Sequence, residues 1–238
     1  MNFARDGYLW FLERAGEKIN YVQGMPFVKQ NVFRSVDPKT GRPDVDPARK
    51  PGTNKRAEFC PSFWGGKNWP PMAFNPRTGL LYFTRLDEGM TIHYDPKLLD
   101  YKPGQRYTGA VAGRLPLPAG APFGYYNAMD PMTGKPKWQV PLHDADIGMW
   151  AGTLSTAGGL LFTGKQTGEF IAMDEDNGKV LWKFQTGSAV NAQPITYTHK
   201  GVQYVSVLSG IAGGNSVQLR AENIQRGGSV WTFALMPD

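Results

Sequence analysis

The sequence is poor in the residues that build disulfides and metal sites. Its 238 residues contain a single cysteine, Cys60, and three histidines. One cysteine excludes an intramolecular disulfide and any cysteine-based zinc or haem-attachment motif. A buried, inert thiol is the interpretation we favour for Cys60. His93, His143 and His199 lack the spacing of metal ligands and are interpreted as surface or strand residues.

Long apolar runs and helical periodicity are also missing. No run reaches transmembrane length, no heptads occur, and residues 1–7 lack the basic and apolar regions of a signal peptide. With 29 Gly, 19 Pro and 13% aromatic residues, the composition is that of a turn-rich folded chain rather than a disordered one. The predicted fold class is all-β, without a membrane span.

Familiar catalytic motifs do not occur, and two partial matches need an interpretation. Residues 159–165 begin like a phosphate-binding loop, but Gln166 stands where Ser or Thr is required, so the segment is interpreted as a hairpin. Asp144 and Asp146 would point the same way on a strand and suit a hard cation. Two ligands are too few for such a site, and a solvated loop is the interpretation we favour.

Positive charge exceeds negative charge, with 26 Lys and Arg against 20 Asp and Glu and a net charge of +6. A basic chain allows an acidic partner. The excess lies mostly in loops such as residues 47–56, and no nucleic-acid-binding motif accompanies it. We therefore expect a solvated loop there and no nucleic-acid binding.

An eleven-residue frame predicts the architecture. The pattern Ala-x-Asp-x-x-x-Gly-x-x-x-Trp spans residues 128–138 and recurs at residues 172–182, 44 residues later. A period of that length is typical of stacked or radially arranged β units. Asp and Gly make a tight turn between two strands, and the Trp ring is available to pack between units. Two unrelated hairpins that share turn chemistry are the alternative.

Weaker copies of the frame precede these two. Residues 73–83 keep it with Asn for Asp and Phe for Trp, whereas residues 35–41 keep only the turn. Residues 11–16 are interpreted as a strand that runs into a shortened turn, and residues 227–235 as a last strand. Because the chain starts in the middle of a unit, we expect it to be part of something longer.

Three stretches are dense in Gly, Trp and amide residues: 64–71, 148–153 and 208–215. Glycine lets the backbone approach a ligand, Trp offers a flat face, and Asn both donates and accepts hydrogen bonds. In a propeller such loops converge on the axis, where a planar ligand would bind. Tight inner turns of closely packed blades explain the same composition equally well.

At these stretches the chain resembles the pyrroloquinoline quinone (PQQ)-dependent alcohol dehydrogenases of the methanol/ethanol dehydrogenase type. The frame looks like the tryptophan-docking motif of that family, and residues 150–162, 194–197 and 201–205 are typical of it. The resemblance implies a partial β-propeller, with about three to four of eight four-stranded blades. Residues 1–238 would form the C-terminal part of one propeller domain, and the blades on the N-terminal side would be missing partners.

The resemblance also implies a cofactor site. In that family PQQ oxidises a primary alcohol, while a bound Ca²⁺ or lanthanide polarises its reactive carbonyl. Arg5 looks like the arginine that hydrogen-bonds the quinone oxygens and stabilises the reduced cofactor, a catalytic role. Asn68 looks like the asparagine that contacts a quinone oxygen, and Trp150 like the tryptophan at the cofactor edge. Asn215 falls where relatives often place another tryptophan.

The same resemblance indicates what the chain lacks. The family's catalytic base and metal ligands would lie upstream, so we expect no turnover by this chain alone. Relatives pair a cysteine at the position of Cys60 with one in the next strand region, and residues 86–90 contain none. The intact enzyme would be periplasmic and would pass electrons to a cytochrome c, which the basic charge suits, or to a quinone. The alternative is a PQQ-like-repeat scaffold that binds protein partners without a cofactor.

Overall fold

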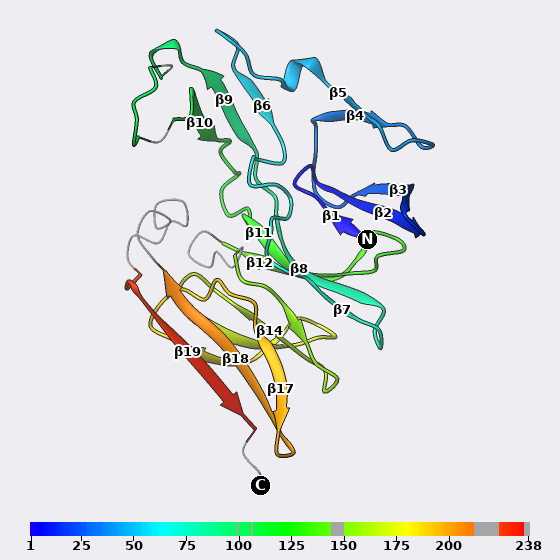
Figure 1. Ribbon diagram of the computed structural model, residues 1–238, viewed down its shortest axis with the longest axis vertical. Coiled ribbons are helices and arrows are strands. Elements are labelled where there is room, and N and C mark those ends of the chain that lie inside the picture. The colour runs from blue at the N-terminus through cyan, green and yellow to red at the C-terminus, as the bar shows by residue number, and fades with distance from the viewer. Residues whose placement is uncertain (99, 106, 144–149, 212–223, 236–238) are drawn as a thin grey trace. The chain divides into compact units, whose positions relative to one another are not determined.

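A computed structural model describes residues 1–98, 100–105, 107–143, 150–211 and 224–235. The regular structure of these residues is almost entirely β-strand, as the sequence predicts, with two short 3-10 helices, η1 (Pro47–Arg49) and η2 (Pro96–Leu98). None of their helices is long and apolar enough to cross a membrane. The chain divides into two compact units, residues 1–67 with 86–121 and residues 68–85 with 122–238 (Figure 1).

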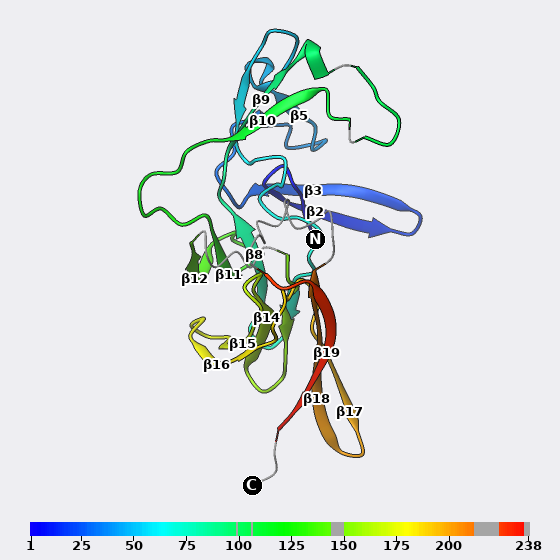
Figure 2. The same ribbon diagram turned by 90° about the vertical axis from the view of Figure 1, so that its left-hand side faces the viewer.

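The first unit is built from small antiparallel sheets. In sheet order the strands described there are β1 (Asn2–Phe3), β2 (Tyr8–Ala15) and β3 (Lys18–Pro26); β4 (Phe33–Val36) and β5 (Pro43–Val45); and β10 (Ala110–Arg114), β9 (Met90–Tyr94) and β6 (Ala57–Phe59). The strands β2 and β3 form a long hairpin, which Figure 2 shows in side view. The expected strand at residues 11–16 is confirmed as the end of β2 and the turn that follows it.

The second unit contains the repeat. In sheet order its described strands are β12 (Pro136–Leu142), β11 (Gly124–Met129), β8 (Leu80–Leu86) and β7 (Ala73–Asn75); β13 (Leu154–Ser155), β14 (Leu160–Gly164), β15 (Glu169–Asp174) and β16 (Val180–Gln185); and β17 (Ile195–His199), β18 (Val202–Ile211) and β19 (Gly227–Ala234). The first two sheets have the four strands expected of a blade. Residues 159–165 lead from β14 into a turn, so the hairpin interpretation is confirmed.

The two full frames occupy equivalent places. Residues 128–138 join β11 to β12 and residues 172–182 join β15 to β16, in each case the last two strands of a four-stranded sheet. Both ladders shift register directly after the frame alanine, between Ala128 and Met129 and between Ala172 and Met173. The repeat is therefore one of structure as well as of sequence.

The weaker copy at residues 73–83 is a different case. It joins β7 to β8, at the opposite edge of the sheet that already contains the frame at 128–138. Its Phe83 is buried at 2% exposure. The interpretation of residues 73–83 as a further copy of the docking repeat is thus wrong in position, because two hairpins of one sheet share the same turn chemistry.

All four copies of the turn have one geometry. The glycine N–H donates to the carbonyl of the Asp or Asn four residues earlier at 2.8–2.9 Å, at Gly41, Gly79, Gly134 and Gly178. The Asp or Asn side chain accepts the backbone N–H two residues on at 2.8–2.9 Å. Each glycine has a φ between +67° and +75°, in the left-handed region where a side chain is strained. The turn prediction is confirmed at every copy.

Trp138 shows how the first four-stranded sheet joins the second. Its indole Nε1 donates to the Glu175 carbonyl at 2.8 Å, and a Cβ on Gly178 would lie 2.7 Å from its ring. The tryptophan of one frame therefore covers the turn glycine of the next. Around it the buried side chains of both sheets form one core, whose buried members are Leu80, Tyr82, Tyr126, Ala128, Leu142, Leu161, Ile171 and Met173.

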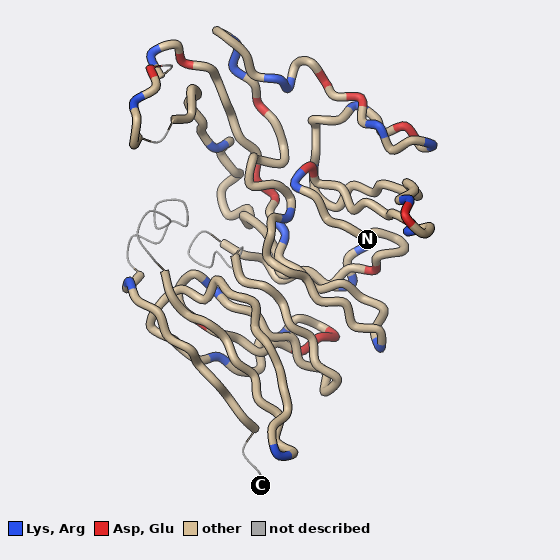
Figure 3. Tube along the Cα trace, in the orientation of Figure 1, with Lys and Arg blue, Asp and Glu red and all other residues tan. Residues whose placement is uncertain are grey.

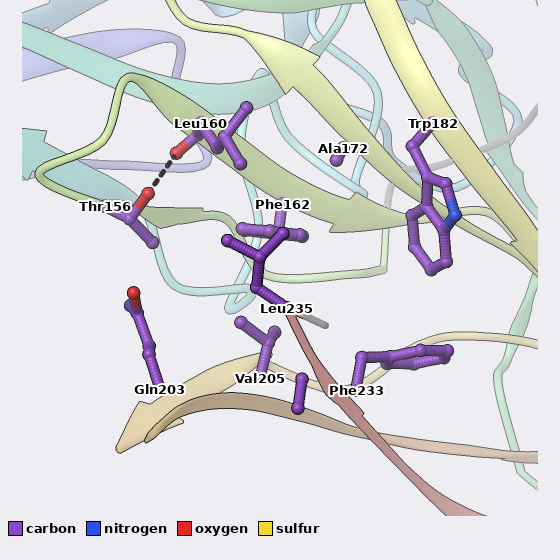
Figure 4. Close-up of a pocket in the computed structure, with 10 residues that line it drawn as sticks. Thr156, Leu160, Phe162, Ala172, Trp182, Gln203, Val205, Phe233 and Leu235 are labelled. Carbon is purple, nitrogen blue, oxygen red and sulfur yellow. Dashed lines mark hydrogen bonds between the residues drawn. The ribbon is translucent and has the colours of Figure 1, made fainter. Parts of the chain in front are cut away.

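Trp182 faces the third sheet of this unit. Its ring meets that of Phe233 on β19 edge-on, with centroids 5.1 Å apart. The two rings belong to a pocket of about 410 Å³ between β14–β16 and β18–β19, which Figure 4 shows with Leu235 across it. None of the described residues that line this pocket is titratable, and they form a packing seam between the sheets.

Candidate functional site

Arg5 lies in the turn between β1 and β2 and is held by glycines. A Cβ on Gly65 would lie 2.5 Å from the Arg5 Cα, and the Gly66 N–H donates to the Arg5 carbonyl at 3.3 Å. Gly65 also has a φ of +84°. Only glycine permits so close an approach in that conformation. The Arg5 side chain is exposed and lines a cavity of the first unit.

Trp150 and Trp69 form an aromatic stack in the second unit. Their ring centroids are 5.8 Å apart with an interplanar angle of 29°. Trp150 is 4% exposed, whereas Trp69 is 61% exposed. Asn68 directly precedes Trp69, and its Oδ1 accepts the Trp69 N–H at 2.8 Å. The stack thus has a buried base, an exposed flat ring and an amide beside it.

The segment after Trp150 is fixed on three sides. The Thr153 N–H donates to the Pro71 carbonyl at 3.1 Å, and the Thr163 hydroxyl donates to the Gly152 carbonyl at 3.1 Å. The Gln193 amide donates to the Thr153 carbonyl at 2.9 Å. A Cβ on Gly152 would lie 2.8 Å from the Gln193 Cδ. These contacts fix the backbone next to Trp150, whose ring stacks on that of Trp69.

The structure brings together two of the four predicted site residues. Asn68 and Trp150 meet through Trp69, whereas Arg5 belongs to the first unit. Asn215 lies outside the described residues, as do Asp144 and Asp146. Trp69 was not among the predicted site residues, although its place directly after Asn68 in a stretch rich in Gly and Trp was a usable signal.

Lys67, the neighbour of Asn68 in the chain, is an unusual lysine. It is only 9% exposed. Removal from water lowers the pKa of its amine to about 8. A lysine at this position titrates in a pH range where most lysines stay charged.

Cys60 is less buried than the sequence analysis expected. It is half-buried rather than buried, although burial still raises the pKa of its thiol. A Cβ on Gly89 would lie 2.5 Å from the Cys60 Sγ, so the residue that faces this thiol is a glycine. Cys60 is free because the chain contains no second cysteine.

Metal ligands do not gather in the part of the chain that the structure describes. No group of three His, Cys, Asp or Glu side chains there could hold a metal ion. The buried carboxylates are committed to ion pairs: Glu175 contacts Arg77, and the Glu88 Oε2 lies 3.2 Å from the Arg114 Nε. The described groups that could contact a cofactor are therefore aromatic, amide and backbone groups of the second unit and, separately, Arg5 of the first unit.

Comparisons with known proteins show the family of the chain. A family model described as PQQ, glucose/ethanol/alcohol dehydrogenase, beta-propeller domain, matches residues 33–205. The chain belongs to this PQQ dehydrogenase family. The resemblance drawn from the frame and from residues 150–162 is thereby confirmed.

Relatives of this PQQ dehydrogenase chain are named as alcohol and methanol dehydrogenases. The quinoprotein alcohol dehydrogenase PedE of Pseudomonas putida is 36% identical over 97% of the chain. A lanthanide-dependent methanol dehydrogenase of Methylorubrum extorquens is 36% identical over 92% of it. The chain spans 37% of the length of each of these two relatives.

Solved structures of the family have the same fold as the chain. A europium-containing methanol dehydrogenase superimposes with a TM-score of 0.82 at 28% identity, over 98% of this chain and 44% of its own. The quinohemoprotein alcohol dehydrogenase of Comamonas testosteroni gives a TM-score of 0.79 at 32% identity, over 98% and 36% respectively. The prediction of a partial β-propeller is confirmed.

Proposed function

We propose that this chain supplies part of the cofactor site of a PQQ-dependent alcohol dehydrogenase that oxidises primary alcohols to aldehydes. The observation that carries the proposal is the Asn68–Trp69–Trp150 arrangement in a chain of this family. An exposed indole on a buried one is a rigid flat surface, and the adjacent amide can donate to an oxygen at a ligand's edge. These groups fit a planar, oxygen-rich quinone.

Each of the predicted site residues has a role in binding the cofactor. When bound, PQQ supplies a quinone that accepts the two electrons lost by the alcohol. Trp150 supports the stack, Asn68 donates to a cofactor oxygen, and Arg5 provides a permanent positive charge for oxygens that gain negative charge on reduction. Asn215 is proposed as a further contact. The proton that leaves the alcohol needs a base, and none is assigned to the described residues.

The metal and the electron acceptor are proposed from the relatives. One relative is named as lanthanide-dependent, and we propose Ca²⁺ or a lanthanide for the intact enzyme. Another is named methanol dehydrogenase [cytochrome c] subunit 1, and a third 1-butanol dehydrogenase (quinone). We propose a cytochrome c as the acceptor, with a quinone as the alternative, and a periplasmic location. The scaffold alternative is not favoured, because these relatives are named as dehydrogenases.

The test is a titration of the purified chain with PQQ, with and without Ca²⁺, followed by tryptophan fluorescence and melting temperature. We expect saturable quenching and a rise in Tm. Asn68→Ala and Trp69→Ala should each weaken binding by about tenfold, which corresponds to roughly 1.4 kcal/mol. Trp182→Phe, which removes a tryptophan of the packing seam, should leave PQQ affinity unchanged.

Two outcomes would contradict the proposal. One is the absence of saturable quenching in the unchanged chain, and the other is equal PQQ affinity in the Asn68 and Trp182 variants. Turnover is a separate question. We propose that the chain alone oxidises no alcohol with an artificial electron acceptor, and any PQQ-dependent turnover would disprove this part.

A further inference from the structure

The first unit contains a second candidate site, a cavity of about 290 Å³. Three cations line it, Arg5, Arg49 and Lys50, together with the aromatic side chains of Phe59 and Phe63. Positive charge and apolar surface therefore share one small space. The PQQ proposal uses only Arg5 of these residues, so Arg49 and Lys50 have no assigned role.

Arg49 is held in place by the backbone. Its Nη1 donates to the Glu58 carbonyl at 2.8 Å, directly before Phe59 at the end of β6. Its Nε is buried and forms an ion pair with the Asp46 carboxylate at 3.6 Å, a separation too long for a hydrogen bond. A buried donor that lacks a hydrogen-bond acceptor destabilises the fold. A ligand oxygen at this position would supply the acceptor.

Two carboxylates offset part of the charge of this cavity: Asp6 in its lining, and Asp46, which pairs with Arg49. Asp6 is the one carboxylate among its lining residues. It already accepts the Tyr8 N–H at 2.8 Å and the Trp10 indole N–H at 3.0 Å. Lys50 is exposed and makes no ion pair with any residue that the structure describes. The lining thus keeps an excess of positive charge.

We propose that this cavity binds a small organic carboxylate of about the size of benzoate. The planar guanidinium of Arg49 matches the geometry of a carboxylate, with Lys50 adding a second charge. Phe59 and Phe63 would contact the apolar body of the ligand. An inorganic anion would leave the aromatic side chains of the cavity in contact with water. The volume of the cavity lies at the lower limit of about 300–1,000 Å³ for small-molecule sites, which is too small for a nucleotide.

The test is a calorimetric titration of the full chain, without PQQ, with benzoate, benzyl alcohol and inorganic phosphate in turn. Benzoate should bind, and the other two should bind at least about tenfold more weakly. Benzyl alcohol lacks the carboxylate that the cations bind, and phosphate lacks the ring that contacts the aromatic side chains. Arg49→Gln and Lys50→Gln should each weaken benzoate about five- to tenfold. Lys39→Gln, an equal loss of charge in the exposed β4–β5 turn, should not.

Several results would overturn the inference. These are no benzoate binding, equal binding of benzyl alcohol, or variants without effect. If Arg49→Gln lowers Tm because the Glu58 contact is lost, Lys50→Gln decides, since the Lys50 side chain is exposed. Displacement of benzoate by PQQ in a one-to-one competition would assign the cavity to the cofactor. Failure of PQQ to bind would leave the benzoate result intact.

Discussion

Gly152 marks the point where the segment after Trp150 meets Gln193, and the space there is full. The Gln193 side chain and its Cα lie where a Cβ of residue 152 would be, at 2.8 Å for Cδ and 3.2 Å for Cα. Close contact of this kind is relieved only by shifts of backbone or side chains. Close packing thus positions the base of the aromatic stack together with the hydrogen bonds of this segment.

Gly152→Ala should therefore destabilise the fold by about 1–3 kcal/mol, because the added methyl overpacks the contact with Gln193. Urea unfolding measures this change. Gly158→Ala is the matched control, since nothing lies within 4 Å of a Cβ there and no positive φ is present. A Gly152→Ala midpoint equal to that of Gly158→Ala would show that the contact is loose.

The lowered pKa of Lys67 predicts that folding stability depends on pH. Its pKa is about 8 in the fold against 10.5 for an ordinary lysine. Below pH 8 both states hold the proton, whereas between about pH 8 and 10.5 the unfolded state binds more protons, so folding stability rises with pH. The whole rise is on the order of 3 kcal/mol.

Lys67→Met should abolish this rise, and Lys39→Met in an exposed turn should retain it. Urea midpoints at pH 7, 8, 9 and 10 provide the comparison. If the midpoints of the unchanged chain and of Lys67→Met keep a constant difference over this range, the amine is not the group that titrates.

Sequence and structure agree unevenly at the residue scale. Asn68 and Trp150 belong to stretches with a marked composition, but they were predicted from the resemblance to the PQQ-dependent family, before their contact through Trp69 was known. The Arg49 cavity could not be predicted, because no sequence motif links the residues of η1 and β6 that form its wall. The burial of Lys67 and the partial exposure of Cys60 also depend on contacts that no local pattern encodes.

The turns of the frame are the elements that the sequence predicts best. Hydrogen bonds within six residues define them, and these recur at every copy. The order of strands decides at which edge of a sheet a turn lies, and the local sequence pattern does not encode that order. Residues 73–83 were misplaced for this reason, since β9 and β10 come between β8 and its partner β11 in the chain.

The misplaced turn offers a direct measurement of tryptophan docking. Gly178 and Gly79 have φ values of +75° and +69° in the same turn, but the Trp138 ring covers only Gly178. Gly79→Ala should cost about 1–2 kcal/mol from backbone strain alone. Gly178→Ala should cost a further 1–3 kcal/mol or so from overpacking against the indole. If thermal unfolding shows equal losses of stability for the two variants, the indole moves away from the added methyl group at no energetic cost.

The sheet of β17, β18 and β19 differs from the others in charge. Figure 3 shows β18 and β19 without a charged residue along either strand. In the described part of this sheet β19 is a terminal strand, and the paired residues Val230 and Leu208 are 68% and 57% exposed. Terminal strands without charged residues pair readily with other chains.

We therefore expect the purified chain to self-associate as its concentration rises, which sedimentation velocity measures. Val230→Lys should reduce association, because a lysine on a terminal strand must be desolvated before another strand can pair. Ala157→Lys adds the same charge in the exposed turn before β14 and should leave association unchanged. A monomer at every concentration would contradict the expectation.

The order of strands in the first four-stranded sheet also has a consequence for synthesis on the ribosome. Strand β8 is buried along nearly its whole length, yet its neighbour β11 begins only at Gly124, after β9 and β10 have been made. At about 5–20 residues per second, the nascent β8 waits roughly 2–8 s for that neighbour. During this interval β11 is not available to cover the apolar side chains of β8, so chaperone binding to nascent chains should be strongest after β8 has left the ribosome and before β11 has left it.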